Sequence, residues 1–130
     1  NVNPFEDAVV AVDGLHGVMD KQVARRERRS VHGRLWDFFY NPMWSRMGDE
    51  SKGSPGTYYY ARGGLICHFW NTFDQVLLRP SLLPYYDEDS LTVISHVGGW
   101  DVLSVDPGQD GPDHAPLVVR LSVETERGDG

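Results

Sequence analysis

The chain has 130 residues, 40% hydrophobic and 24% charged, a balance typical of one globular domain rather than of a disordered chain. Its net charge of −7 argues against a general nucleic-acid-coating surface, which is basic, but suits an enzyme whose acidic residues hold a metal. No apolar run approaches the ~20 residues that span a bilayer, and we expect no membrane span. The single cysteine, Cys67, cannot form an internal disulfide, which fits a reducing, cytoplasmic location.

The first predicted element is a helix at the N-terminus. Asn3 is a suitable N-cap, Pro4 suits the first helical position, and Glu6 completes a capping box. Apolar residues at positions 5, 8, 9 and 12 share one face of this helix, and Gly14 indicates its end.

Residues 20–30 have the composition of a second, exposed helix. Four arginines gather in it, at positions 25, 26, 28 and 29. They form either a solvated helical face or a patch that contacts phosphate or a partner, and the sequence leaves both open. The aromatic segment 35–44 predicts a packed element that ends at Asn41-Pro42, and the glycines and prolines of 45–56 predict a loop.

From residue 57 onward the pattern predicts strands. Residues 57–62 favour a strand, and a turn at Gly63-Gly64 lets 65–69 return as its hairpin partner. The tryptophans and the tyrosines at 58–60 predict packing between layers, with a base-stacking platform as the alternative. The further expected elements are strands at 73–78, 91–94 and 117–123, a turn or short helix at 81–84 and an acidic loop at 85–90. Helices followed by strands predict an α/β chain of the α+β type with a mainly antiparallel sheet.

Two titratable residues, Asp113 and His114, stand together in a loop that opens into the last strand. A carboxylate can hold a divalent cation there, and an imidazole can carry a proton near neutral pH. Alone, the pair is also compatible with an ordinary loop. Asp74 lies in an otherwise apolar segment, where an unpaired buried carboxylate is costly, and this favours a partner such as His114. The other histidines, at 16, 32, 68 and 96, lack metal-ligand spacing and indicate surface or satisfied structural positions.

Three segments together resemble the endonuclease/exonuclease/phosphatase superfamily. The run Pro112-Asp113-His114-Ala115-Pro116 is similar to the Ser-Asp-His-x-Pro motif that closes this superfamily, with Pro112 in place of Ser. Residues 70–78, WNTFDQVLL, are similar to its Trp-x-x-x-Asp strand, and Thr57-Tyr58-Tyr59 resembles its Thr-(Tyr/Phe) strand. Asn1 stands where the Asn of a Gly-Asp-Phe-Asn motif would be, so the resemblance implies that residues 1–130 are the C-terminal half of such a domain.

The resemblance implies half of a four-layer α/β/β/α sandwich. This half would be one mainly antiparallel sheet with helices on its outer face. Its inner face would expose strands such as 117–123, and so we expect a cover, either the N-terminal half of the same domain or a second copy of the chain.

The resemblance also implies a metal-dependent phosphoester hydrolase, whether phosphodiesterase, nuclease or phosphatase, in which an activated water attacks in line. His114 would contact the scissile phosphate, Asp74 would orient the His114 ring, and Asp113 would help to hold Mg²⁺ or Mn²⁺. Asn1 would position the phosphate or the water. The substrate would be a phosphate ester, with nucleic acid among the candidates.

The principal metal carboxylate and the base of the superfamily fall before Asn1, and we therefore expect residues 1–130 alone to be inactive. The alternative is a catalytically silent binding or assembly module that keeps the fold.

Overall fold

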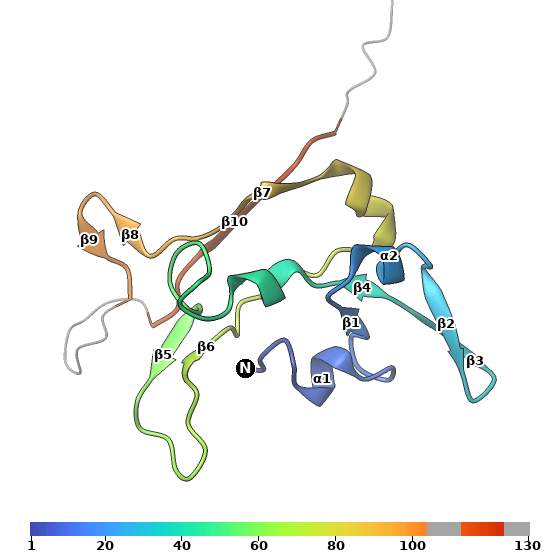
Figure 1. The fold of residues 1–130 in the computed structure, drawn as a ribbon, viewed down its shortest axis with the longest axis horizontal. Coiled ribbons are helices and arrows are strands. Elements are labelled where there is room, and N and C mark those ends of the chain that lie inside the picture. The colour runs from blue at the N-terminus through green and yellow to red at the C-terminus, as the bar shows by residue number, and fades with distance from the viewer. Residues whose placement is uncertain (104–112, 124–130) are drawn as a thin grey trace, which may run out of the picture.

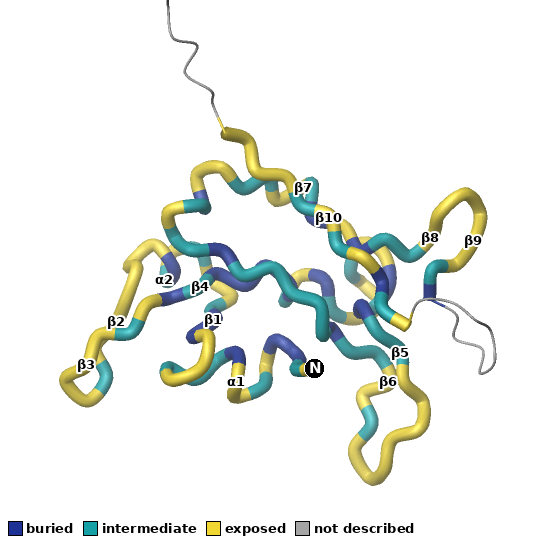
Figure 2. The backbone as a smooth tube through the Cα atoms, turned by 180° about the vertical axis from the view of Figure 1, so that it is seen from behind, coloured by how far each residue is buried: buried dark blue, intermediate teal, exposed yellow. Residues whose placement is uncertain are grey.

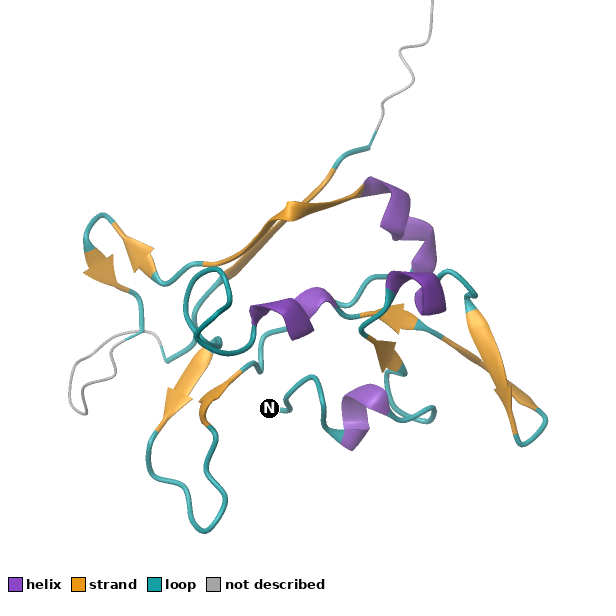
Figure 3. Cartoon of the chain, viewed as in Figure 1, coloured by secondary structure: helices purple, strands orange, loops and turns teal. Residues whose placement is uncertain are grey.

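A computed structural model describes residues 1–103 and 113–123 of the chain. Its helices are short: α1 Asp7–Val10, α2 Lys21–Ala24, and the 3₁₀ helices η1 Pro42–Arg46 and η2 Pro80–Tyr85 (Figure 3). The described strands are β1 Gly17–Val18, β2 Arg28–Val31, β3 Arg34–Asp37, β4 Phe39–Tyr40, β5 Tyr58–Tyr60, β6 Phe69–Asn71, β7 Tyr86–Val93, β8 His96–Val97, β9 Trp100–Asp101 and β10 Leu117–Leu121. The fold is therefore of the mixed α+β type and rich in strands, as the sequence predicts.

Within the described residues the strands pair as five two-stranded sheets. β1 and β4 are parallel, whereas β2–β3, β5–β6, β7–β10 and β8–β9 are antiparallel. The β2–β3, β5–β6 and β8–β9 hairpins project away from the middle of the molecule (Figure 1), and exposed residues dominate their outer ends (Figure 2). The described strands do not join into the one continuous sheet that the sequence analysis expects.

Two apolar clusters hold the middle of the molecule together. The first has Met43, Leu91, Val93, Leu103 and Ala115 at its centre and joins η1 to the β7–β10 pair. The second joins α2, β4 and η2 through Ala24, Tyr40, Leu78 and Leu83. Val76 and Tyr86 pack against both clusters, so the segment before η2 and the start of β7 link them.

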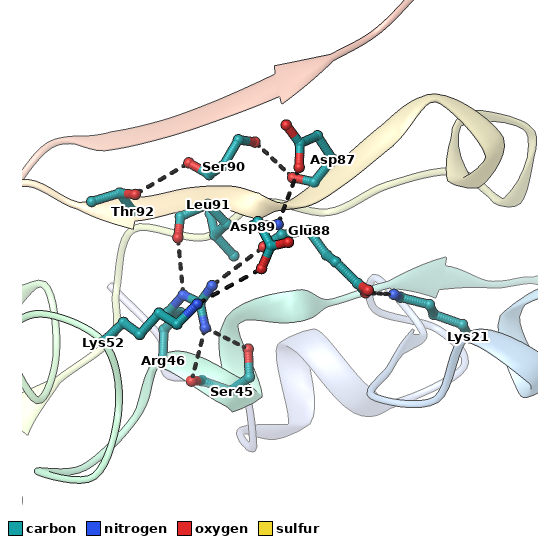
Figure 4. Close-up of polar contacts among 10 residues, drawn as sticks. All are labelled: Lys21, Ser45, Arg46, Lys52, Asp87, Glu88, Asp89, Ser90, Leu91 and Thr92. Atoms are coloured by element: carbon teal, nitrogen blue, oxygen red, sulfur yellow. Dashed lines mark hydrogen bonds and ion pairs between the residues drawn. The ribbon is translucent and has the colours of Figure 1, made fainter.

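A buried arginine ties η1 to β7. Arg46 is 8% exposed, and its guanidinium donates to the carbonyl oxygens of Leu91 (3.0 Å) and Glu88 (3.4 Å) (Figure 4). It also donates to the carbonyl and the hydroxyl oxygens of Ser45, both at 3.3 Å. On the same stretch of β7, Glu88 pairs with Lys21 of α2. A buried cation needs such partners, and here they are mainly main-chain oxygens.

The predicted N-terminal helix is wrong in length and in its cap. Only one turn, α1, is helical, and its N-cap is Glu6 rather than Asn3. Glu6 does accept the backbone N–H of Asn3 at 2.7 Å, as in a capping box, but the Asn3 side chain bonds to Asn71 and Thr72 instead. A contact across the fold thus takes the side chain that local capping would use.

The prediction of one exposed helix over 20–30 is also wrong in its second half. Asp20 caps α2 by accepting from Gln22 and Val23, but the helix ends at Ala24. Glu27 has a φ of 64°, and the chain continues as the β2–β3 hairpin with Gly33 in its turn. Local composition favours a helix here, whereas pairing with 34–37 selects a strand.

Two predictions in the second half of the chain are wrong as well. Residues 73–78 make no strand, and only Leu78 forms an isolated bridge, with Tyr40. The expected acidic loop 85–90 is instead the first part of β7, paired with β10. The loop at 45–56, the 3₁₀ element near 81–84 and the strands near 57–62 and 117–123 are confirmed, although the hairpin partner of β5 is 69–71 rather than 65–69.

No helix in the described part of the chain is long and apolar enough to cross a membrane.

Candidate active site

The predicted Asp74–His114 contact is present. The Oδ2 atom of Asp74 lies 2.7 Å from Nδ1 of His114, although the two residues are 40 positions apart in sequence. The side chains are partly open to solvent, at 38% and 30% exposed. The expected geometry is therefore confirmed for this pair, while the catalytic roles of its members stay predictions.

Thr57 positions both members of the pair. This residue is fully buried, and its Oγ1 accepts the backbone N–H of Asp74 at 3.1 Å. Its own carbonyl oxygen accepts the N–H of Ala115 at 2.7 Å, and its N–H donates to Asn71 at 2.8 Å. One residue at the start of β5 thus fixes the main chain beside Asp74 and beside His114.

Aromatic rings flank the His114 imidazole. The Tyr58 ring lies 4.8 Å from it and the Phe73 ring 6.3 Å, measured between centroids. Tyr58 also forms a β-bridge with His114, so its position is set by the main chain as well as by packing. These rings shield one part of the Asp74–His114 pair and leave another open to solvent.

A network of hydrogen bonds between polar side chains and the main chain anchors the segment that carries Asp74. The Asn3 side chain accepts from the Thr72 N–H (2.7 Å) and donates to Asn71 Oδ1 (3.0 Å). One residue beyond Asp74, the Gln75 amide donates to the Val2 carbonyl at 2.7 Å and accepts from Asn41 at 2.7 Å. The Asp74 N–H, which a strand would use in pairing, donates to the Thr57 hydroxyl instead, and the two Gln75 bonds hold the same segment in place.

Asn1 lies beside the pair rather than on it. It is exposed and lines a cavity of about 380 Å³ together with Tyr58, Phe73 and Asn71. Tyr58 and Phe73 are the same rings that flank His114, so this cavity borders the site. Among the described residues Asn1 makes no hydrogen bond to Asp74 or to His114.

Asp113 is exposed next to His114, and its expected role as a metal ligand has little support from neighbouring side chains. Within 1–103 and 113–123, no three His, Cys, Asp or Glu side chains gather as a metal site requires. Asp74 already uses Oδ2 on the imidazole. Since Mg²⁺ takes six oxygen ligands, several from water, the donors described here do not by themselves fit a metal centre.

The contact with Asp74 defines the chemistry open to His114. An ionised carboxylate only accepts hydrogen bonds, so this contact requires a proton on Nδ1. The neutral ring then keeps its lone pair on Nε2, and the imidazolium would donate from that atom. The arrangement can therefore accept or donate one proton, or bind an oxyanion, at a fixed position.

The sequence alone placed none of Thr57, Tyr58, Phe73 and Asn3 in the active site. Thr57 and Tyr58 lie in the quoted Thr-(Tyr/Phe) segment, so a signal for them existed. Nothing local in the sequence indicates that Asn3 reaches Thr72, because this contact depends on the fold.

Comparisons with protein-family models, with curated proteins and with solved structures give no match. The resemblance to the endonuclease/exonuclease/phosphatase superfamily therefore rests on the quoted motifs, and the site on the geometry above.

Proposed function

We propose that the chain is part of a metal-dependent phosphoester hydrolase, in which Asp74 and His114 belong to the active site. The single observation that carries the proposal is the 2.7 Å contact between the Asp74 carboxylate and Nδ1 of His114. This contact joins two motifs that the sequence resemblance pairs and that lie far apart along the chain. A carboxylate that fixes the tautomer of a histidine is a recurrent device of catalytic pairs.

In this proposal His114 acts at the phosphate through Nε2. As the imidazolium, it donates a hydrogen bond to an oxygen on which negative charge develops, and Asp74 stabilises that charged form. Asn1 adds an amide donor at the edge of the neighbouring cavity. A phosphate ester, including a nucleic-acid phosphodiester, is the substrate class.

Mg²⁺ or Mn²⁺ is the proposed cofactor, and it would supply Lewis-acid stabilisation of the phosphoryl oxygens. Asp113 is this chain's candidate ligand, and the remaining donors would come from outside residues 1–130. The donors among the described residues do not complete a metal centre.

We also propose that residues 1–130 form one half of a four-layer sandwich. Two-stranded sheets are marginally stable alone, and here each described sheet has only two strands. On and after β10, Val118, Leu121 and Val123 are exposed, which supports a cover over this part of the chain by an N-terminal half or a second copy.

The test compares residues 1–130 with a longer form that adds the segment which the resemblance places before Asn1. Bis(4-nitrophenyl) phosphate is the generic phosphodiester, with Mg²⁺ or Mn²⁺ titrated into each protein. We expect metal-dependent turnover from the longer form and at least about 10²-fold less from 1–130 alone, because catalytic groups are missing. Light scattering should show self-association of 1–130 and none of the longer form.

Robust turnover by 1–130 alone would contradict the half-site. No turnover by the longer form, under any metal concentration, would instead favour a catalytically silent binding or assembly module.

A further inference from the structure

A cavity of about 310 Å³ lies where α1, β1, α2 and β2 meet, well away in sequence from Asp74 and His114. One side of it is apolar, with a valine from each of α1, β1 and α2 and the ring of Phe38. The other side has Arg26, Arg28 and Arg29. None of the described residues that line this cavity is acidic, in a chain whose net charge is −7.

His16 forms part of the cavity wall and is 3% exposed. Its Nε2 accepts from Nε of Arg29 at 3.0 Å, so the neutral ring carries its proton on Nδ1. Nδ1 is buried against the main chain of Asp37 and is not accessible to solvent. His16 therefore acts on a ligand through Arg29, whose guanidinium it holds at the cavity wall.

The arginines are available to a ligand. Arg28 reaches Asp37 only at 3.7 Å, with both side chains more than half exposed, and such a pair is weak. Arg29 uses Nε on His16, and its two terminal amino groups have no hydrogen-bond or ion-pair partner among the described residues. Arginine is the residue best suited to phosphate, because its planar group donates two parallel hydrogen bonds.

We propose that this cavity, lined by His16, Arg26, Arg28 and Arg29, is a binding site for the phosphate group of a small molecule. Its volume suits one phosphate and a small apolar substituent against the valines and Phe38, rather than a polymer backbone. The arginines supply the charge and the donors, and His16 positions one of them, Arg29. This site is separate from the proposed active site and does not depend on it.

The test titrates inorganic phosphate, and phenyl phosphate in parallel, into the chain in the presence of a chelator. Binding is followed by calorimetry and by the ¹⁵N signals of the His16 ring. We expect both probes to bind and the Nε2 signal of His16, which accepts from Arg29, to shift. Phenyl phosphate should bind more tightly if the natural ligand is a monoester, and equally if it is free phosphate.

Arg26→Gln and Arg28→Gln change exposed residues and should leave the fold intact, and each should weaken binding about tenfold. Arg34→Gln is the matched control, since Arg34 is on the same hairpin, carries the same charge and stacks on Trp36 instead of lining the cavity. It should leave the affinity unchanged. His114→Ala should also leave it unchanged, which separates this site from the active site.

The proposal would be overturned if neither probe binds, or if Arg34→Gln and Arg28→Gln weaken binding equally. It would also be overturned if His114→Ala abolishes binding while the arginine variants retain it. Binding of a single-stranded oligonucleotide without binding of the small phosphates would overturn it too.

Discussion

Two histidine–carboxylate pairs of nearly equal length lie in the described part of the chain, and they differ in exposure and in their surroundings. Asp74 and His114 meet at 2.7 Å, with side chains about one-third exposed. Asp101 and His96 meet at 2.6 Å, but at 70% and 68% exposed. The second pair lies directly across the small β8–β9 hairpin, so its partners are register neighbours. The first pair joins segments that are distant along the chain.

A short distance therefore does not mark a site. The surroundings do: Thr57 fixes the main chain on both sides of the Asp74–His114 pair, and Tyr58 and Phe73 flank the ring. Within the described residues His96 has Ser95 as a further partner, with Nδ1 at 2.9 Å from the hydroxyl. An exposed pair of that kind contributes little free energy, although both of its members line a cavity of about 460 Å³ beside Trp70 and Leu103.

Replacement of His114 should have the largest effect. In the longer form that completes the proposed domain, His114→Ala should lower turnover of the phosphodiester by roughly 10²–10⁴-fold, because a proton donor to the phosphate is removed. The free energy of unfolding should change far less, since the ring is partly exposed. Steady-state kinetics and urea unfolding measure the two effects.

His96→Ala is the control and should leave both quantities unchanged. If His96→Ala and His114→Ala reduce turnover equally, the contrast between the two pairs has no functional meaning.

A third polar centre sharpens the comparison, because Arg46 is a buried cation whose partners are oxygens of Ser45, Glu88 and Leu91. Arg46→Met should lower the free energy of unfolding by about 3 kcal/mol, since the oxygens of Ser45, Glu88 and Leu91 would lose a charged donor. Lys52→Met removes another cation near β7, an exposed one that pairs with Asp89 at 3.7 Å (Figure 4). It should cost at most about 0.5 kcal/mol. Similar losses in urea unfolding of the two variants would show that the main-chain contacts of Arg46 are unimportant.

Asp74 is a positioning residue in the proposed site, and Asp74→Asn should therefore act through His114. We expect turnover to fall by about 10²-fold, because the amide can stabilise the wrong tautomer. The specific readout is ring ¹⁵N NMR, in which His114 of the parent protein should carry its proton on Nδ1 and the variant should lose that preference. Asp101→Asn is the matched control and should not alter the His114 signals. An unchanged tautomer in Asp74→Asn would remove the orienting role.

The sequence predicts the Asp74–His114 contact because two motifs, each unremarkable alone, occur in the order that a common site needs. It predicts the end of β7, as the strand expected at 91–94, but not the acidic first part of that strand. Asp87, Glu88 and Asp89 look like a loop, yet Asp87 pairs with Arg120 of β10 at 3.3 Å and Glu88 with Lys21 of α2. These partners are distant in sequence, and local composition contains no signal for them.

The opposite error occurs at 73–78, where local composition favours a strand. Gln75 bonds to the Val2 carbonyl and the Asn41 side chain, and the Asp74 N–H bonds to Thr57, so that contacts with other parts of the chain hold the segment. The arginine-rich stretch after Ala24 shows a related limit, because its pairing with the neighbouring residues 34–37 makes it a strand. Contacts between distant segments decide the first part of β7 and residues 73–78, and a hairpin partner decides residues 28–31. The composition of each segment alone contains neither signal.

A third histidine gives the last and smallest expected effect. His16 pairs with a cation rather than a carboxylate, and burial followed by the Arg29 charge lowers its pKa below the usual 6.5. Below pH 6.5 the unfolded chain binds a proton at this position before the folded chain does, so stability falls as the pH falls from 6.5 through the lowered pKa. His16→Gln lacks this titration and should show a shallower decline of the urea midpoint between pH 7 and pH 5. His96→Gln removes an exposed histidine that pairs with a carboxylate and should not flatten the curve. Parallel curves for the parent protein and His16→Gln would mean that His16 does not contribute to the acid sensitivity of the fold.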